Sequence, residues 1–196
     1  PNDRAADDYL TCLEKVYPHA DYVTINISSP NTQGLRDLQD TEQLNSLLAA
    51  LNNRRLELSD EFQKRVPLLV KVAPDLEDEQ IPGMAEVVIQ NEFDGLIATN
   101  TTVSREAVEG MRHADEQGGL SGAPVLAMAN HVLAEFRTYL PPAIALIGTG
   151  GITNGDDAAE KIKLGADLVQ FYTGFVYKGP DLVGDCVKAI QKHESA

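Results

Sequence analysis

The chain has 196 residues, 43% of them hydrophobic and 23% charged, which suits one well-buried domain and is not the composition of a disordered or fibrous protein. A formal net charge of −14 and a pI near 4.5 argue against the broad basic surface that nucleic acid requires, so no nucleic-acid partner is expected. No run of about 18 apolar residues occurs, so no segment is expected to span a membrane.

Helical and extended patterns alternate along the chain. Helices are predicted at 6–16, 42–58, 79–90, 125–139 and 156–164. Apolar runs rich in β-branched residues lie at 22–27, 68–72, 95–98, 144–147 and 168–171. Each run is nearly continuous rather than alternating, which is typical of parallel strands covered on both faces. The order of elements therefore predicts an α/β fold.

Helix-capping and helix-ending residues support some of these boundaries. Asn154 is expected to cap the helix that follows it, and Gly165 to end that helix. Asp75 is expected to cap the helix after the second strand. No repeat or flexible linker interrupts the chain, so residues 1–196 are interpreted as a single domain of about five βα units.

The cysteines and histidines indicate neither a disulfide framework nor a metal site. Cys12 and Cys186 stand at opposite ends of the chain without a metal-binding spacing, and both are expected to be small core residues. The four histidines are scattered and are interpreted as surface or hydrogen-bonded residues.

Five strands do not close a (β/α)8 TIM barrel, which needs eight. The fold is therefore expected to be either an open sheet or a barrel whose first strands are missing from this chain. The sequence begins with Pro1 rather than methionine, which favours the second possibility.

Polar residues follow every predicted strand, where parallel α/β folds place their chemistry. Asn26, Asn31 and Asn100 can donate and accept hydrogen bonds together, which suits a planar, amide-rich ligand. Asparagines after strands are also common turn formers. The long connections 28–41 and 99–124 have the length of lids or binding segments.

The last two strand ends are candidates for a phosphate site. Gly150 and Gly151 follow one strand, and Tyr172-Thr173-Gly174 follow the next. Their backbone N–H groups could hold a phosphate, and the helix that opens near Gly155 could add its positive end. The alternative is a structural strand-to-helix turn.

Lys71 lies inside an apolar strand, where an unpaired ammonium group has a large desolvation cost. It is expected to pair with an anion, such as a substrate carboxylate or the electron-rich edge of a reduced flavin. A Schiff-base lysine is a second interpretation, and a structural ion pair is a third.

Ser29 has no triad partner and no nucleophile-elbow motif around it, so on chemistry alone it is interpreted as a turn residue. It could act as a base in a closed, dry site if Thr32, three residues later, helped to pass the proton on.

The strand-end motifs together resemble those of the class 2, quinone-linked dihydroorotate dehydrogenases, and the resemblance covers essentially the whole chain. They are Asn-Ile-Ser-Ser-Pro-Asn-Thr at 26–32, Val-Lys-Val-Ala-Pro-Asp-Leu at 70–76, Thr-Asn-Thr-Thr at 99–102, Gly-Gly-Leu-Ser-Gly at 118–122, Gly-Thr-Gly-Gly at 148–151 and Leu-Val-Gln-Phe-Tyr-Thr-Gly at 168–174. Thr149 is a small departure from the family pattern.

This resemblance implies a flavin enzyme of pyrimidine biosynthesis that oxidises (S)-dihydroorotate to orotate and passes the electrons to a membrane quinone. Ser29 resembles the base that removes the C5 proton while hydride passes from C6 to the flavin, whereas class 1 enzymes have cysteine there. The implied contacts with the FMN cofactor are Asn26, Lys71, Thr99, Gly122, Gly150, Gly151, Tyr172 and Thr173. The implied substrate contacts are Asn26, Asn31, Asn100 and Thr101.

The family pattern also contains three earlier barrel strands and N-terminal helices that reach the membrane. The resemblance therefore implies that this chain is a C-terminal portion of an FMN-binding barrel, and that the whole protein is peripheral on the cytoplasmic side of the cell membrane. Two alternatives stay open: a barrel lyase or aldolase with Lys71 as the Schiff-base residue, and a truncated, non-catalytic remnant.

Overall fold

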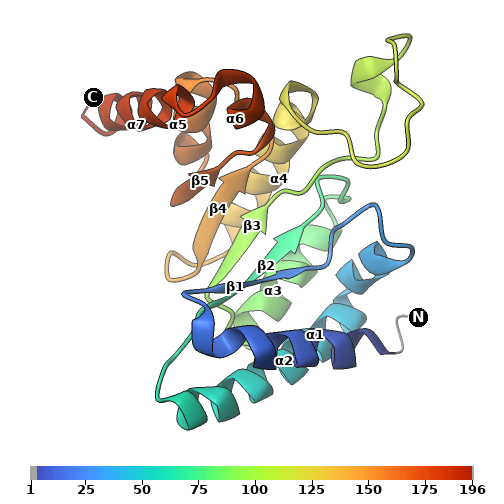
Figure 1. Ribbon diagram of the computed structural model, residues 1–196, viewed down its shortest axis with the longest axis vertical. Coiled ribbons are helices and arrows are strands. Elements are labelled where there is room, and N and C mark those ends of the chain that lie inside the picture. The colour runs from blue at the N-terminus through green and yellow to red at the C-terminus, as the bar shows by residue number, and fades with distance from the viewer. Residues whose placement is uncertain (1–3, 196) are drawn as a thin grey trace.

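A computed structural model describes residues 4–195 and contains one five-stranded parallel sheet. The strands are β1 (Val23–Asn26), β2 (Leu68–Val72), β3 (Gly95–Ala98), β4 (Ala145–Thr149) and β5 (Leu168–Gln170). They pair in chain order from β1 to β5, so each strand lies beside its neighbour in sequence. Figure 1 shows the five strands side by side with their arrowheads pointing the same way. The α/β prediction and the five strand positions are confirmed.

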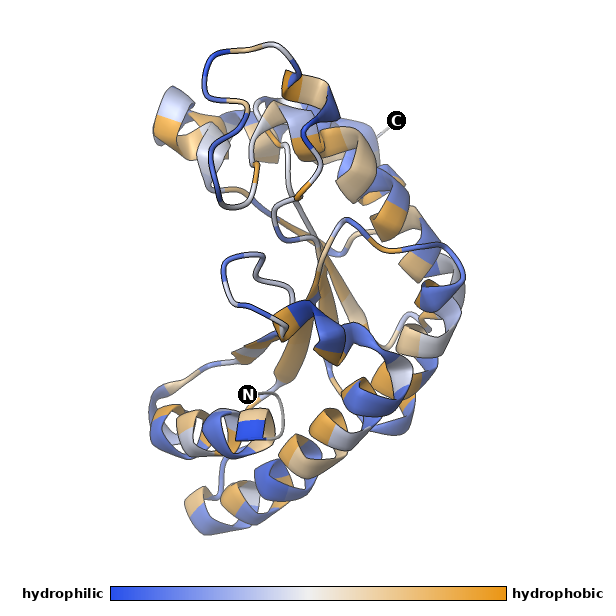
Figure 2. Cartoon of the chain, turned by 90° about the vertical axis from the view of Figure 1, so that its right-hand side faces the viewer, coloured by the Kyte–Doolittle hydropathy of each residue, from blue (hydrophilic) through white to orange (hydrophobic). Residues whose placement is uncertain are grey.

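The helices of the chain are α1 (Ala5–Val16), α2 (Thr41–Phe62), α3 (Gln80–Gln90), α4 (Leu126–Tyr139), α5 (Gly155–Lys163), α6 (Thr173–Lys178) and α7 (Asp181–Glu194). In Figure 2 most of them form a curved layer on one side of the sheet. None of the helices within residues 4–195 is long and apolar enough to cross a bilayer.

The sequence explains why the helices begin where they do and which face they bury. The Asp40 side chain accepts hydrogen bonds from the N–H groups of Glu42 and Gln43, which caps α2. Asn154 caps α5 in the same way by accepting from the Asp157 N–H at 3.0 Å, as predicted. The α2 residues Leu44, Leu47, Leu48 and Leu51 recur at helical spacing and are all buried against the sheet.

The two faces of the sheet have different roles. Leu68, Val70 and Val72 of β2 belong to the main core beneath the helices. Leu69 and Lys71 alternate with them and therefore lie on the opposite face, where Leu69 forms a small buried cluster with Ile97 and Ile147. The strand register places Asn26 beside Lys71, and Lys71 beside Ile97. This second face ends at the polar strand ends.

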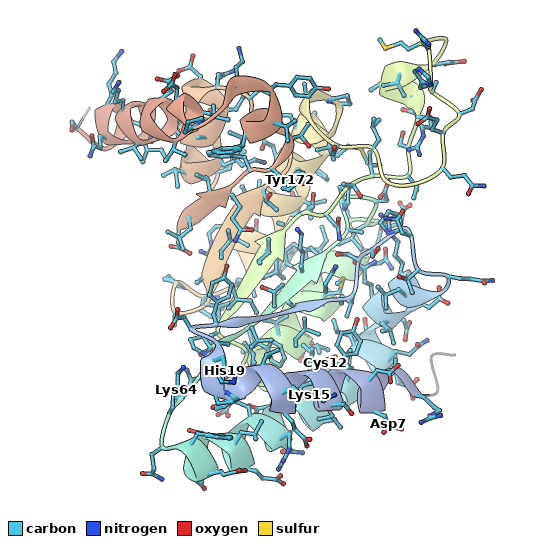
Figure 3. All side chains as sticks on the ribbon, viewed as in Figure 1. Asp7, Cys12, Lys15, His19, Lys64 and Tyr172 are labelled. Atoms are coloured by element: carbon cyan, nitrogen blue, oxygen red, sulfur yellow. The ribbon has the colours of Figure 1, made fainter. Side chains whose placement is uncertain are left out.

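Several expectations about local structure were incomplete or wrong. Helices α6 and α7 were not predicted, and α2 continues to Phe62 rather than ending at Leu58. Asp75 does not cap α3, which begins at Gln80 and whose N-cap residue makes no side-chain hydrogen bond. Cys186 is buried as expected, but Cys12 is exposed on α1 (Figure 3).

Candidate active site

A pocket lies where β2, β3, β4 and β5 end, with about 460 Å³ of empty space including its opening to solvent. It is lined by Lys71, Thr99, Asn100, Thr101, Ser121, Gly122, Val125, Thr149, Gly150, Gly151, Ile152, Phe171, Tyr172, Thr173 and Gly174. The lining thus brings together residues from the ends of four strands. Figure 3 shows the labelled Tyr172 just beyond the end of β5, and its side chain is 83% exposed.

One end of the pocket is a backbone cradle built from glycines. Gly122, Gly150 and Gly151 have φ angles of 79°, 99° and 84°, a region that side chains disfavour. A Cβ at Gly151 would also clash with the backbone of Leu126, and one at Gly150 would lie 3.0 Å from the Cβ of Ala129. The first turns of α4 therefore pack directly beneath this loop. Only glycine can bring the backbone so close to both the helix and the pocket.

The nearby loops close the same end of the pocket. The Thr173 hydroxyl donates a hydrogen bond to the Ser121 hydroxyl at 2.9 Å, joining the segment after β5 to the end of the 99–124 connection. Gly155 does not line the pocket and instead packs against Asp185 and Ala189 of α7. The start of α5 is therefore not part of the pocket lining, whereas Thr173 and Gly174, which open α6, are. A contribution of the positive end of α5 to a phosphate site stays a prediction.

Lys71 lines the same pocket from β2, which β3 separates from the strand that precedes Gly150 and Gly151. Burial lowers the pKa of its ammonium group. Within residues 4–195 the structure records no carboxylate or hydrogen-bond partner for it, so the structural ion pair considered from the sequence is not formed. A half-buried cation without a protein anion, facing a pocket, is suited to an anionic ligand.

Asn26 and Asn100 come together at the ends of β1 and β3. The Asn26 side-chain oxygen accepts hydrogen bonds from Asn100 Nδ2 at 3.1 Å and from the Ser28 hydroxyl at 3.0 Å. Asn100 is held in place by its own N–H, which donates to the carbonyl of Val72 at 2.8 Å. Asn100 Nδ2 also donates to the Ser28 hydroxyl at 3.0 Å, and Asn100 Oδ1 accepts from the Thr101 N–H at 2.8 Å, so the amide groups at these two strand ends are held in fixed positions.

Ser29 and Thr32 lie on the loop after β1, outside the pocket lining. The Ser29 hydroxyl oxygen accepts a hydrogen bond from the Asn31 N–H at 3.3 Å. No hydrogen bond joins Ser29 to Thr32 in the part of the chain that the structure describes, and Thr32 is exposed. Asn31 lies close to Gly118. Residues 28–39, called the base loop because they include the candidate base Ser29, therefore approach the long loop that follows β3.

Sequence reasoning gave no role to Arg36 and misread Asp75. Arg36 Nη1 lies 2.8 Å from Asp75 Oδ2, and this ion pair joins the loop after β1 to the end of β2. A basic residue in one strand-end loop and an acidic residue in another could have suggested the pair. Because 39 positions separate the two residues, the sequence alone could not distinguish this ion pair from many other possible pairs.

Lys161 is a second buried cation, and it lies behind β4 rather than in the pocket. Its ammonium group donates to Asn130 Oδ1 at 2.7 Å and so joins α5 to α4. Burial lowers its pKa to about 8, although nearby Asp157 opposes the shift. The sequence offered a weak signal, because Lys161 occupies the buried stripe of an amphipathic helix.

These features match the α/β-barrel class of proteins, in which the active site lies at the carboxyl ends of the parallel strands. The family model described as dihydroorotate dehydrogenase matches residues 2–193. The chain therefore belongs to the dihydroorotate dehydrogenase family, and the resemblance drawn from its motifs is confirmed.

The relatives that match are longer proteins. The chain is 56% identical over 195 residues to a protein named dihydroorotate dehydrogenase (quinone) from Burkholderia mallei strain SAVP1, covering 100% of this chain and 56% of that relative. A relative of the same name from Burkholderia thailandensis is 55% identical over the same length. The chain thus spans about half the length of these relatives, and it corresponds to their C-terminal part.

Solved structures show the same fold. The Eimeria tenella DHODH in complex with ferulenol has a TM-score of 0.88 and 35% identity, covering 96% of this chain and 54% of that one. Ligand-free DHODH from the same organism has a TM-score of 0.87 and 38% identity, covering 96% and 55% respectively. The predicted TIM-barrel fold is confirmed, and this chain holds five of its strands.

Proposed function

We propose that this chain is the C-terminal, FMN-binding part of an enzyme that oxidises (S)-dihydroorotate to orotate in pyrimidine biosynthesis and passes the electrons to a membrane quinone. The observation that carries the proposal is one pocket that is lined both by the unpaired cation Lys71 of β2 and by a glycine cradle after β4. A flavin mononucleotide has a matching polarity, with an electron-accepting ring at one end and a phosphate at the other. The names of the relatives, and the fact that they match this chain over its full length, support the same activity.

The residues of this pocket fit FMN. Gly122, Gly150, Gly151, Tyr172 and Thr173 would hold the phosphate end, where the positive φ angles of the three glycines let the backbone line the pocket. Lys71 and Thr99 of the lining, with Asn26 bonded to the lining residue Asn100, would contact the ring, and the Lys71 ammonium would balance negative charge on it. When bound, FMN supplies the hydride acceptor.

The residues at the ends of β1 and β3 fit the substrate. Asn26, Asn31, Asn100 and Thr101 offer amide and hydroxyl groups that match the amide edges of a dihydropyrimidine ring. Ser29 would take the C5 proton, with Thr32 passing it on after the loop closes over the substrate and excludes water. The Asn31 N–H already donates to the Ser29 oxygen, and such a bond favours loss of the hydroxyl proton.

The remaining parts of the proposal concern the whole protein. Residues 1–196 would act as one domain whose sheet joins further barrel strands outside this chain. The complete protein would lie on the cytoplasmic side of the cell membrane as a peripheral protein, with quinone and membrane contacts made by segments outside this chain. No nucleic-acid partner is proposed, since the net charge is −14.

The test is the visible absorption of the complete gene product containing this chain, recorded without oxygen before and after addition of dihydroorotate. We expect flavin bands that bleach with dihydroorotate and return when a quinone is added. Ser29→Ala should keep the bands but bleach about 100-fold to 10,000-fold more slowly, which is the usual contribution of a positioned base. A yellow protein that dihydroorotate does not bleach would refute the substrate, and a colourless protein would support the non-catalytic remnant.

One observation favours a second candidate, a Schiff-base lyase or aldolase. Burial lowers the pKa of Lys71, and a lowered pKa makes a lysine amine a better nucleophile. Borohydride reduction in the presence of small carbonyl compounds, followed by mass analysis, would trap an adduct on Lys71. Tightly bound flavin together with no adduct would eliminate this candidate.

A further inference from the structure

Arg36 connects three strand-end segments through one guanidinium group. Its Nε donates to the carbonyl of Ser28 at 3.1 Å, its Nη1 to Asp75 Oδ2 at 2.8 Å, and its Nη2 to the carbonyl of Thr101 at 2.9 Å. These partners follow β1, β2 and β3 respectively. The planar fork of arginine can hold three such acceptors in a fixed arrangement, which a lysine cannot do.

Arg36 is already committed to protein partners and is not placed to bind substrate. Each of its three nitrogens donates to a protein oxygen, and its side chain is only 21% exposed. The Asp75 carboxylate, 18% exposed, balances its charge. An arginine that held an anionic substrate would instead present a free pair of N–H groups to the pocket.

Asp75 extends the same connection to the segment after β3. Its Oδ1 accepts hydrogen bonds from the Thr102 hydroxyl and, at 3.2 Å, from the Val103 N–H. Thr102 also pairs with Leu120 through two backbone hydrogen bonds. The carboxylate that was expected to cap a helix instead fixes the start of the long loop beside the pocket.

The base loop is consequently held at both of its ends. At one end Ser28 is buried, and its hydroxyl group bonds to Asn26 and Asn100. At the other end the Gln39 side chain accepts from the Ala73 N–H at 2.8 Å. Arg36 donates to the Ser28 carbonyl, which belongs to the peptide group that joins Ser28 to Ser29. This hydrogen bond therefore orients the backbone where it enters Ser29.

We propose that Arg36, paired with Asp75, is a positioning residue that sets Ser29 and Thr101 in register with each other for proton removal from the substrate. The inference rests on the proposed function, because it takes Ser29 as the base and Thr101 as a substrate contact. A displacement of about 1 Å at a reacting group can slow a reaction about 100-fold. Losing the fork should therefore impair proton removal while leaving the flavin pocket intact.

The test separates the two half-reactions in the complete gene product. Arg36→Met should slow flavin reduction by dihydroorotate by about 100-fold in anaerobic stopped-flow experiments. FMN content and reoxidation of the flavin by a quinone should stay within about twofold of the wild type, because neither uses Ser29. Arg36→Lys, which keeps the charge but not the fork, should recover only part of the loss, and Asp75→Asn should slow the same step.

The matched control is Arg137→Lys. Arg137 also donates to backbone carbonyls and pairs with a carboxylate, Asp167, but it lies at the opposite end of the sheet. Its substitution should leave flavin reduction unchanged. Equal slowing of both half-reactions or loss of FMN in Arg36→Met would overturn the positioning role, as would an unchanged reduction rate. A wild-type protein whose flavin dihydroorotate fails to reduce would instead overturn the proposed function itself.

Discussion

At the scale of single residues, Lys71 is the group whose state depends most on a ligand. Its ammonium is half-buried on the face of the sheet that ends at the pocket, and burial lowers its pKa. An anion in the pocket would favour the charged form and raise that pKa again. Binding and protonation are therefore linked at this residue.

Lys71→Met should weaken FMN binding by about 10-fold to 100-fold, since a hydrogen bond to a charged group contributes about 1.5–3 kcal/mol. In the wild type, FMN affinity should fall at alkaline pH as the ammonium of the free protein loses its proton. Because the pKa is lowered, the fall should begin at a lower pH than for an ordinary lysine. Fluorescence titration of the apoprotein with FMN between pH 7 and pH 10 measures both effects.

The variant should lack that alkaline fall in affinity. Lys163→Met is a matched control, since the Lys163 side chain is 48% exposed and, among residues 4–195, pairs with Glu160 on its own helix. An affinity for FMN that does not change in Lys71→Met at any pH would contradict a role for Lys71 in flavin binding.

At the scale of elements, the glycine cradle depends on how α4 and α5 pack behind β4. The Lys161 stem lies against Gly148, where a Cβ would come within 3.0 Å of Lys161 Cδ. Its ammonium reaches Asn130 on α4, one residue after the alanine that lies beneath Gly150. The same buried side chain thus joins the two helices that support the loop.

Lys161 should make stability depend on pH. Its pKa is about 8 in the folded protein and near the ordinary value of 10.5 when unfolded. Between these values the unfolded state binds more protons, so this group makes the free energy of unfolding rise with pH. At about 1.4 kcal/mol per pKa unit, the gain is at most about 3–4 kcal/mol.

Urea unfolding at pH 7 and pH 10 tests this prediction as the difference between the wild type and Lys161→Met. The wild type should gain stability relative to the variant at the higher pH, whereas Lys163→Met should show no such relative change. The lost bond to Asn130 costs the variant stability at both pH values and does not affect the comparison. A stability difference between the wild type and Lys161→Met that does not change with pH would contradict a lowered pKa for Lys161.

At the scale of the whole molecule, β1 and β5 each have a strand neighbour on only one side within the described residues. Unpaired strand edges readily associate with other strands. Leu168 on β5 is 59% exposed, and Tyr172, two residues after the strand, is 83% exposed, so an apolar and an aromatic residue are accessible near this edge. The net charge of −14 opposes association by mutual repulsion between chains.

Residues 1–196 expressed alone should therefore self-associate and retain little FMN, in contrast to the complete gene product. Association should increase with salt concentration, because salt screens the repulsion while leaving the edge and its apolar residues unaffected. Size-exclusion chromatography with light scattering, combined with visible absorption, measures both properties. A monomeric fragment with stoichiometric FMN would contradict this expectation.

Much of the fold followed from local pattern. Each predicted strand lies within about a residue or two of its observed place, and Asn154 caps α5 as expected. These features depend on residues close together in sequence, where periodicity and capping chemistry are decisive. The strand-end motifs likewise picked out Lys71, Thr99 and the glycines that now line one pocket.

The rest was decided by packing between distant segments. Aspartate is a common helix-capping residue, yet Asp75 bonds to Arg36 and Thr102 instead. It does so because the strand order brings the loops that carry these residues together. Gly155 at the start of α5 packs against α7, a helix that was not predicted, and does not line the pocket. Local propensity is worth about 1 kcal/mol at a cap, and a tertiary ion pair with several hydrogen bonds exceeds it. The sequence by itself determined which elements form and which residues follow them, while only the tertiary structure decided which of those residues meet.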